Sequence, residues 1–309
     1  MTTIRRWPSA ALVFLLACGG AAAQDRGTLD PQPLPPLAHP NDPSTPAKEL
    51  FGRKTTPTTM QSRTIGFYSR GCLAGGIALP VNGPAWQVMR LSRNRNWGHP
   101  ELIRTLEALA NKARAQAGWP GLLVGDMSQP RGGPMLTGHA SHQVGLDADI
   151  WLTPMPDREL TRAEREDVSA TNVVAADRRD VDPALWTPAH VGVIKTAARM
   201  PQVERIFVNA AIKKALCRDN DPDRAWHHKV RPYWGHDYHF HIRIRCPKDS
   251  PDCKPQPPVP PGDGCGNDLN WWFQEFVLHP PPPKTPPKPN PGPTMAALPP
   301  ACRIVLDAP

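Results

Sequence analysis

The chain has 309 residues, 41 of them proline, and a formal net charge of +8 at pH 7. This length permits one domain with a substantial core, and no stretch beyond the N-terminus is apolar enough to stop transfer through a bilayer, which excludes an integral membrane protein. The charge suits a polyanionic partner such as a cell wall or a nucleic acid. Basic and aromatic residues do not alternate on any one element, so we expect no nucleic-acid partner.

The first 23 residues have the pattern of a secretory signal. Arg5 and Arg6 provide the positive start, Ala10–Ala17 the short apolar run, and the small residues up to Ala23 the cleavage site. The run is too short to span a bilayer as a helix, so we expect residues 1–23 to be removed and the mature protein to be exported. A lipoprotein signal with acylation at Cys18 is the alternative.

Clusters of proline mark two extensions. A Pro-rich leader covers residues 24–64, and a Pro-rich C-terminal segment covers residues 276–309. Proline favours stiff, extended backbone, so we expect both extensions to be spacers or surface wraps rather than core. The predicted domain lies between them, at residues 65–275.

Hydrophobic periodicity predicts a mixed domain. Strands are expected at residues 86–91, 121–126, 144–152, 203–208 and 238–246, and helices at residues 100–117, 183–200 and 210–217. This mixture predicts an α+β fold, with a small and mostly antiparallel sheet and helices packed against it.

Seven cysteines occur in the chain, and removing Cys18 with the signal leaves six. An even number suits disulfides in an oxidising compartment, and none of the six has the Cys-x-x-Cys spacing of a zinc or redox site. Cys246 and Cys253 flank a short loop and suit a local bridge. The sequence leaves the other pairings open.

The segment 138–150 joins a histidine-rich loop to a predicted strand. His142 and Asp149 are seven residues apart, an odd separation that puts them on opposite faces of a straight strand. They converge only if the chain bends, and Gly145 is where a bend costs least. Asp149 then shares a strand face with Asp147, which either orients a ligand imidazole or is an ordinary solvated residue.

Three histidines lie within residues 236–241. On a strand, His239, His241 and Arg243 share one face, and the apolar residues between them share the other. One interpretation is a pair of hydrogen-bonded surface histidines. The other combines His241 with His142 and Asp149 into two imidazoles and a carboxylate, which is the ligand set of a catalytic zinc site with its fourth position left for water.

The phrases around these residues resemble the zinc motifs of the LAS metallopeptidases, a group that includes lysostaphin-like enzymes, D-Ala-D-Ala carboxypeptidases and the hedgehog signalling domain. The chain is similar to the penicillin-insensitive murein endopeptidases in particular, over roughly residues 65–275. The leader and the region 155–182 depart from that pattern. The resemblance rests on Gly138-His-Ala-Ser-His-Gln-x-Gly-Leu-Asp-x-Asp149, His236-Asp-x-His-x-His241, Phe67-Tyr-Ser-Arg-Gly-Cys72, Gly98-His-Pro100, Arg205-Ile-Phe-Val-Asn209 and Gly262-Asp-Gly-Cys-Gly266.

The resemblance implies a periplasmic zinc enzyme that hydrolyses peptide cross-links of peptidoglycan, chiefly D-alanyl–meso-diaminopimelate bonds. By the same resemblance, His142, Asp149 and His241 are the zinc ligands. His239 and His236 then lie beside the metal as acid/base groups or stabilise the transition state.

Two further implications come from the same family. His139 lines the site, either as a fourth ligand or as a substrate contact. The expected disulfides are Cys72–Cys302, which returns the C-terminal segment to the domain, Cys217–Cys265 and Cys246–Cys253.

The expected chemistry is attack by a metal-activated water whose proton passes to an imidazole. His239 is favoured for this role because it shares a strand face with His241. The chain has no His-Glu-x-x-His helix, and Ser141 lacks the Gly-x-Ser-x-Gly elbow of a serine nucleophile. The alternatives are a stem-peptide carboxypeptidase, in which Arg131 or Arg243 would hold the terminal carboxylate, and a non-catalytic peptidoglycan-binding module.

Some conspicuous residues have ordinary interpretations. We expect the adjacent His227 and His228 to lie on the surface. We expect Trp271-Trp272-Phe273 to be an apolar anchor held by a disulfide, with stacking on sugars or peptide as the alternative. No feature of the sequence predicts an oligomeric state.

Overall fold

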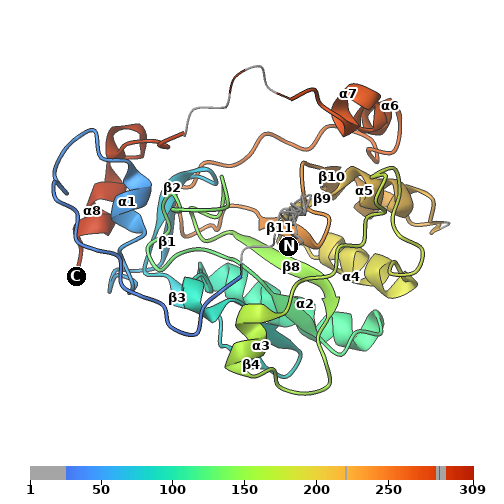
Figure 1. The fold of residues 1–309 in the computed structure, drawn as a ribbon, viewed down its shortest axis with the longest axis horizontal. Helices are drawn as coiled ribbons and strands as arrows, with labels where there is room; N and C mark the ends of the chain where they lie inside the picture. Colours follow the sequence, from blue (N-terminus) through green and yellow to red (C-terminus); the bar gives the residue numbers. More distant parts are fainter. Residues whose placement is uncertain (1–25, 220, 283–284, 286–289) are drawn as a thin grey trace, which may run out of the picture.

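A seven-stranded sheet forms the centre of the computed structural model, which describes residues 26–219, 221–282, 285 and 290–309 (Figure 1). The predicted signal and Cys18 lie outside these residues. The strand order is β10-β9-β11-β8-β7-β5-β4, and only the β10–β9 and β7–β5 pairs are parallel. The strands are β4 (Asn82–Gly83), β5 (Trp86–Val88), β7 (Leu122–Val124), β8 (Asp147–Pro154), β9 (Val203–Val208), β10 (Val230–Pro232) and β11 (His239–Ile244).

Helices flank this sheet, which confirms the predicted α+β class. The longest is α2 (Pro100–Gln116), which packs against α4 (Pro188–Arg199). The buried face of α2 includes Leu102, Leu106 and Leu109, each stabilising the fold by roughly 1.5–3 kcal/mol. The remaining helices of the main body are α3 (Arg162–Asp167), α5 (Ala210–Cys217) and the 3₁₀ turns η1 (Leu91–Arg93) and η2 (Ala225–Lys229).

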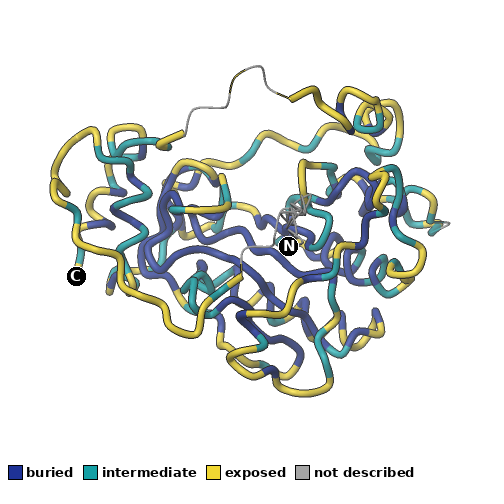
Figure 2. Tube along the Cα trace, viewed as in Figure 1, coloured by how far each residue is buried: buried dark blue, intermediate teal, exposed yellow. Residues whose placement is uncertain are grey.

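Helix α2 begins with a histidine cap. The ring of His99 accepts a hydrogen bond from the backbone N–H of Glu101 at 3.2 Å, and Pro100 occupies the first helical turn, where its missing N–H costs nothing. The sequence predicted this helix to within a residue. Its buried face then packs against the central strands, which Figure 2 shows as a continuous buried interior.

A second, smaller core lies at one end of the molecule. Helix α1 (Ala47–Phe51) and helix α8 (Ala301–Asp307) lie side by side there (Figure 1), against the hairpin of β1 (Arg63–Phe67) and β2 (Arg70–Ala74). Phe51 is fully buried, so the last part of the predicted leader packs into a core. Arg131 donates to the carbonyls of Val305 and Leu306 at the end of α8.

Three disulfides fasten the outer segments, and their pairings are those that the resemblance implied. Cys72–Cys302 joins the C-terminal segment to β2, Cys217–Cys265 joins α5 to the loop before α6 (Asn267–Asn270), and Cys246–Cys253 closes the loop after β11. The small outer elements are β3 (Ile77–Ala78), β6 (Trp97–Gly98), η3 (Trp271–Phe273), α7 (Glu275–Leu278) and η4 (Met295–Ala297). Among the described residues, no helix is both long and apolar enough to cross a bilayer.

Candidate metal centre

Two adjacent strands hold the histidines and aspartates of the predicted site. In the antiparallel pair β8–β11, His241 lies opposite Asp149 and Arg243 lies opposite Asp147. Residues directly opposite each other have Cβ atoms about 4.5–5.5 Å apart, so this register alone brings imidazole and carboxylate together. The apolar residues that alternate with them, such as Phe240, fill the core.

The loop before β8 turns where the sequence predicted a bend. Gly145 has φ +71°, and a Cβ there would lie 2.7 Å from the Leu73 side chain, so both conformation and space require glycine. The regular strand starts only at Asp147. His142 also has a positive φ, +65°, and its backbone N–H donates to the Asp147 carboxylate at 3.1 Å. Strain of this kind in a non-glycine residue is typical of functional sites.

Four imidazoles surround the carboxylate of Asp149. The nitrogen nearest to it belongs to His241 (Nδ1, 3.3 Å), followed by His142 (Nε2, 3.4 Å), His239 (Nε2, 3.5 Å) and His139 (Nδ1, 3.5 Å). His142, His239, His241 and Asp149 are all buried. Residues from one loop and two strands therefore place four imidazoles beside one carboxylate, and the ligand atoms of His139, His142 and Asp149 all lie within 4.8 Å of one another.

Further carboxylates hold the outer nitrogens of two of these rings. Asp147 lies 2.9 Å from Nε2 of His241 and also accepts from Nε of Arg243 at 2.6 Å. Asp126 lies 3.0 Å from Nε2 of His139. An imidazole held by a carboxylate on one nitrogen, with the other nitrogen facing a shared point, is the usual arrangement of a metal-binding histidine.

Both strand aspartates are anionic at neutral pH. Burial would raise the pKa of the Asp149 carboxyl, but the surrounding imidazoles, His239 first, hold that pKa well below its ordinary value. Burial would also raise the pKa of Asp147, and the Arg243 guanidinium and the His241 imidazole lower it instead. Each buried carboxylate is thus stabilised by positive or hydrogen-bonding neighbours.

The imidazoles differ from one another in their proton affinity. Burial lowers the pKa of His239, and it lowers the pKa of His236 to about 3. His241 has a raised pKa, because the charge of Asp147 and its hydrogen bond outweigh the effect of burial. His236 and His239 are therefore neutral at pH 7 in this arrangement, as a proton-accepting imidazole must be.

The donor set fits a zinc ion. Both ring nitrogens of His142 and Oδ1 of Asp149 are buried without a hydrogen-bond partner, and a buried polar atom left unpartnered costs about 1–3 kcal/mol. Ligand atoms around a tetrahedral zinc with bonds of about 2.0–2.1 Å lie roughly 3.3–3.4 Å apart. The separations of 3.3–3.5 Å between Asp149 and the imidazole nitrogens agree with that spacing.

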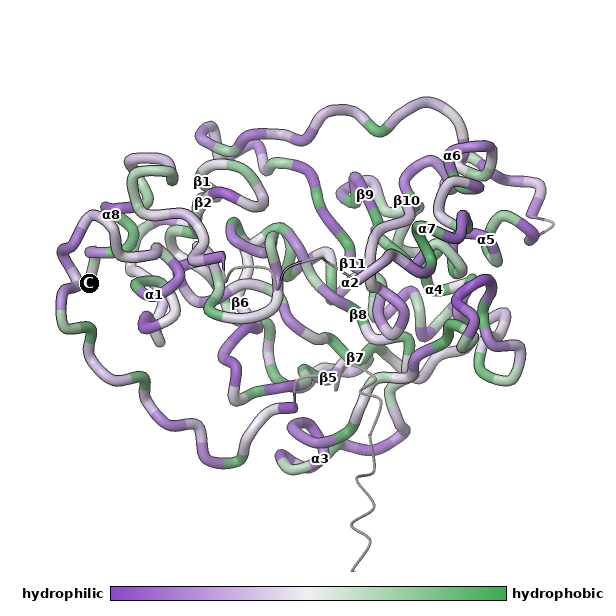
Figure 3. Tube along the Cα trace, turned by 45° about the horizontal axis from the view of Figure 1, so that its top comes forward, coloured by the Kyte–Doolittle hydropathy of each residue, from purple (hydrophilic) through white to green (hydrophobic). Residues whose placement is uncertain are grey.

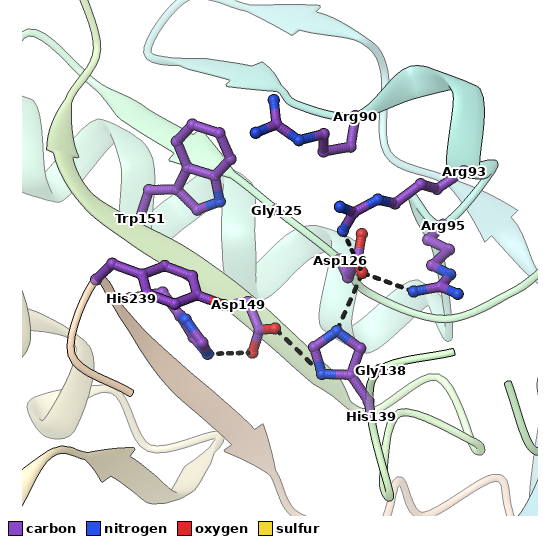
Figure 4. Close-up of a pocket in the computed structure, with 11 residues that line it drawn as sticks. Arg90, Arg93, Arg95, Gly125, Asp126, Gly138, His139, Asp149, Trp151 and His239 are labelled. Carbon is purple, nitrogen blue, oxygen red and sulfur yellow. Dashed lines mark hydrogen bonds and ion pairs between the residues drawn. The ribbon is translucent and has the colours of Figure 1, made fainter. Parts of the chain in front are cut away.

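A pocket opens on one side of Asp149 (Figure 4). His139 and His239 line it together with Asp149, whereas His142 and His241 do not and lie on the buried side. The site therefore has an inner pair of imidazoles and an outer pair. The rest of the wall consists of Arg90, Arg93, Arg95, Gly125, Asp126, Gly138, Trp151 and Tyr238.

This wall contains residues that the sequence interpretation missed. Arg93 and Arg95 both contact Asp126 at 2.9–3.0 Å, and burial, which would raise the pKa of Asp126, is outweighed by its contacts with His139 and Arg95. The available signal was position: Asp126 ends the predicted strand 121–126, and Arg90 is the last residue but one of the predicted strand 86–91. Side chains at strand ends commonly line sites.

Two arginines nominated from the sequence lie elsewhere. Arg243 is buried against Asp147 and stacks over the ring of Tyr68 at 4.1 Å, and Arg131 caps α8. Neither lines the pocket.

Two other histidines complete the comparison with the sequence predictions. The ring of His236 lies 4.8 Å from that of His239, and its Nδ1 donates to the Trp234 carbonyl at 2.7 Å. The prediction that His227 is exposed is wrong: its ring is fully buried beside Trp226, while His228 is exposed.

An α+β fold with a buried aspartate among four imidazoles defines a class, that of proteins with a His/Asp centre suited to a metal ion. Comparison with known proteins narrows this class. The family model described as penicillin-insensitive murein endopeptidase matches residues 64–307, and the chain belongs to this family.

Individual relatives agree with that assignment. The chain is 49% identical over 212 residues to a penicillin-insensitive murein endopeptidase of Haemophilus influenzae, which covers 68% of this chain and 73% of the relative. Proteins of the same description from Yersinia enterocolitica and Klebsiella pneumoniae are each 44% identical over 254 residues, which covers 82% of this chain and 88% or 89% of the relative.

Proposed function

We propose that this protein is a zinc-dependent endopeptidase that hydrolyses peptide cross-links of peptidoglycan, of the D-alanyl–meso-diaminopimelate type. The observation that carries the proposal is the Asp149 carboxylate with four imidazole nitrogens at 3.3–3.5 Å, in a chain of the murein endopeptidase family. His142, Asp149 and His241 are the proposed zinc ligands, and His139 is the candidate for a fourth ligand.

The position of each ring supports this division of roles. His142 and His241 lie on the buried side of Asp149, where a ligand needs no access to substrate. When bound, zinc supplies a Lewis acid for the scissile carbonyl and lowers the pKa of water towards 7. Asp147 orients the His241 ring through Nε2, so that Nδ1 faces the shared point.

His239 is the proposed acid/base group. It lines the pocket, and its Nε2 lies 3.5 Å from Asp149, close enough to accept a proton from a water beside that carboxylate and to pass it to the leaving amine. His236 is the second candidate for this role. Its Nδ1–H donates to the Trp234 carbonyl, so its Nε2 remains a proton acceptor.

The pocket favours an anionic substrate. Three arginines line it, and two aspartates, Asp126 and Asp149, offset part of their charge. A meso-diaminopimelate cross-link carries a free carboxylate next to the scissile amide, which guanidinium groups bind well. The same charge favours a second candidate, a stem-peptide carboxypeptidase, because a terminal carboxylate would occupy the same place.

Export to the periplasm is part of the proposal. The three disulfides suit an oxidising compartment, and peptidoglycan lies outside the cytoplasm.

Digestion of purified cross-linked muropeptide dimers tests the proposal. The metal-loaded protein should convert dimers to monomers, a chelator should stop the reaction, and added zinc should restore it. Dimers that persist with metal present would exclude the endopeptidase, and cleavage that survives chelation would exclude zinc. Loss of the terminal D-alanine from uncross-linked pentapeptides, with dimers intact, would identify the carboxypeptidase instead.

A further inference from the structure

Exposed aromatic side chains gather in one place on this molecule. Among the residues that the structure describes, the strongly exposed aromatic side chains are Tyr233, Trp234, Trp271 and Phe276, each between 42% and 57% exposed. All four belong to one row, which also includes the half-buried Trp272. Contiguous exposed apolar surface is uncommon on a soluble protein and marks binding sites.

Ring contacts connect four members of this aromatic row, and the fifth, Tyr233, lines the same small pocket as Trp234 and Trp272. Trp234 lies 4.9 Å from Trp272 and 6.2 Å from Trp271, and Trp271 lies 6.2 Å from Phe276. The rings come from two separate segments, the loop after β10 and the η3–α7 region, and Figure 3 shows β10 beside α7, whose apolar residues are green. The row is therefore a surface built by tertiary contacts.

The aromatic row continues directly from the candidate metal centre. Tyr233 lies 5.7 Å from the ring of His236, and His236 lies 4.8 Å from that of His239. The row starts beside the acid/base imidazoles and leads outwards.

A small pocket within the row mixes flat rings with polar groups. Tyr233, Trp234 and Trp272 line it together with two polar residues, Arg178 and Asn209, and three apolar ones, Ala210, Val277 and Leu278. A pyranose ring presents C–H groups on its faces and hydroxyl groups at its rim, so an aromatic face next to a guanidinium matches a sugar better than it matches a charged peptide. The arginine-lined pocket beside Asp149 has the opposite character.

We propose that the aromatic row binds the glycan strand of peptidoglycan while a peptide cross-link occupies the metal centre. The inference rests on the proposed function, because it assigns the second half of the same substrate. Distances support it: an extended peptide of about four residues spans roughly 13 Å, and the two ring-to-ring steps from His239 through His236 to Tyr233 are 4.8 Å and 5.7 Å. A sugar attached to a bound stem peptide therefore reaches the row.

The test compares two substrates that differ in their sugar. Trp271→Ala combined with Phe276→Ala should slow digestion of intact sacculi at least fivefold, roughly the loss on truncating aromatic anchors. The same double variant should cut sugar-free cross-linked peptide dimers at the wild-type rate. Trp271→Phe should retain activity on sacculi, because it keeps a ring. The matched control is Ile304→Ala, on α8 at the other end of the molecule and 63% exposed, which should change neither rate.

Binding is measured separately from hydrolysis. Chelator-treated wild-type protein should co-sediment with sacculi, peptide-free glycan chains should displace it, and the double variant should remain in solution. Equal loss on both substrates in a folded double variant, or no displacement by glycan chains, would overturn the proposal. Wild-type protein that cuts neither substrate but still binds sacculi through the row would instead count against the proposed endopeptidase activity alone.

Discussion

Among the residues that the structure describes, two clusters of metal-type side chains occur, and only one of them has the charge that favours a metal ion. The first is the centre around Asp149. The second brings Cys217, His227 and Cys265 within 4.8 Å of one another, with both ring nitrogens of His227 buried and unpartnered. By residue type and spacing, the second cluster resembles a zinc site as closely as the first does.

Charge and bonding separate the two clusters. Cys217 and Cys265 form a disulfide, so neither sulfur is a thiolate, which is the form that binds metal. Lys213, buried beside His227, donates to its carbonyl at 2.9 Å, and burial lowers the pKa of that lysine to about 7. The Asp149 centre has anionic carboxylates instead. Negative ligands stabilise a divalent cation, whereas a buried lysine beside the donor atoms disfavours it.

Removing a proposed ligand should have the largest effect. His241→Ala takes away one imidazole and leaves Asp147 and Arg243 paired without it. We expect bound zinc, measured by elemental analysis of purified protein, to fall well below one equivalent, and cleavage of muropeptide dimers to become undetectable. A variant that keeps a full equivalent of zinc would show that His139 or His239 holds the ion in its place.

Removing the proposed acid/base group should affect turnover only. His239→Ala should retain zinc and lose about 10²–10⁴-fold in kcat, the usual contribution of a positioned proton-transfer group. His236, whose ring contacts that of His239, provides the comparison. His236→Ala should lower kcat less than His239→Ala does. If His239→Ala loses zinc as completely as His241→Ala, the assignment of inner and outer imidazoles is wrong.

A smaller effect on zinc binding is expected from Asp147, which contacts the proposed ligand His241. Asp147→Asn keeps the shape of the side chain but removes the charge that holds His241 and Arg243. Zinc affinity, measured by competition with a chelator of known affinity, should fall about 10–100-fold. An unchanged affinity would mean that strand register alone positions the ring, and Asp147→Asn with normal unfolding in urea would confirm that the fold is intact.

The sequence predicted most of what backbone periodicity controls. The helix from Pro100 and the strand Val203–Val208 lie where expected, and alternation placed His239 and His241 on one strand face. The bend at Gly145 was predictable because a seven-residue separation required it, and only glycine adopts φ +71° without strain.

What the sequence did not predict depends on contacts between distant segments. Asp126 and its arginine partners reach the pocket from other strands and loops, and no local pattern brings them to the site. The buried position of His227 depends on the disulfide between Cys217 and Cys265 around it. Exposure of Trp271 likewise depends on how the loop after the disulfide packs, and a run of three aromatic residues is equally consistent with an anchor.

The smallest predicted effect concerns His227, and it distinguishes the two clusters by folding stability rather than by metal content. His227→Leu should leave zinc content and activity unchanged, because the ring binds nothing. It should alter the pH dependence of folding. Burial, and then the charge of Lys213, lower the pKa of His227 from 6.5 to about 4, so the unfolded chain takes up a proton between these values and the folded protein does not. Wild-type stability therefore falls as the pH falls from about 6.5 to about 4.

Urea unfolding at pH 7 and pH 4.5 measures this difference. The wild-type free energy of unfolding should fall between pH 7 and pH 4.5, and roughly 1–3 kcal/mol of this loss should be absent in His227→Leu. The contributions of other buried histidines, such as His190, remain in both proteins. An identical pH slope would mean that the His227 ring gains a proton and a partner in the folded state. The second cluster would then be a polar site after all, and its contrast with the Asp149 centre would rest on the disulfide alone.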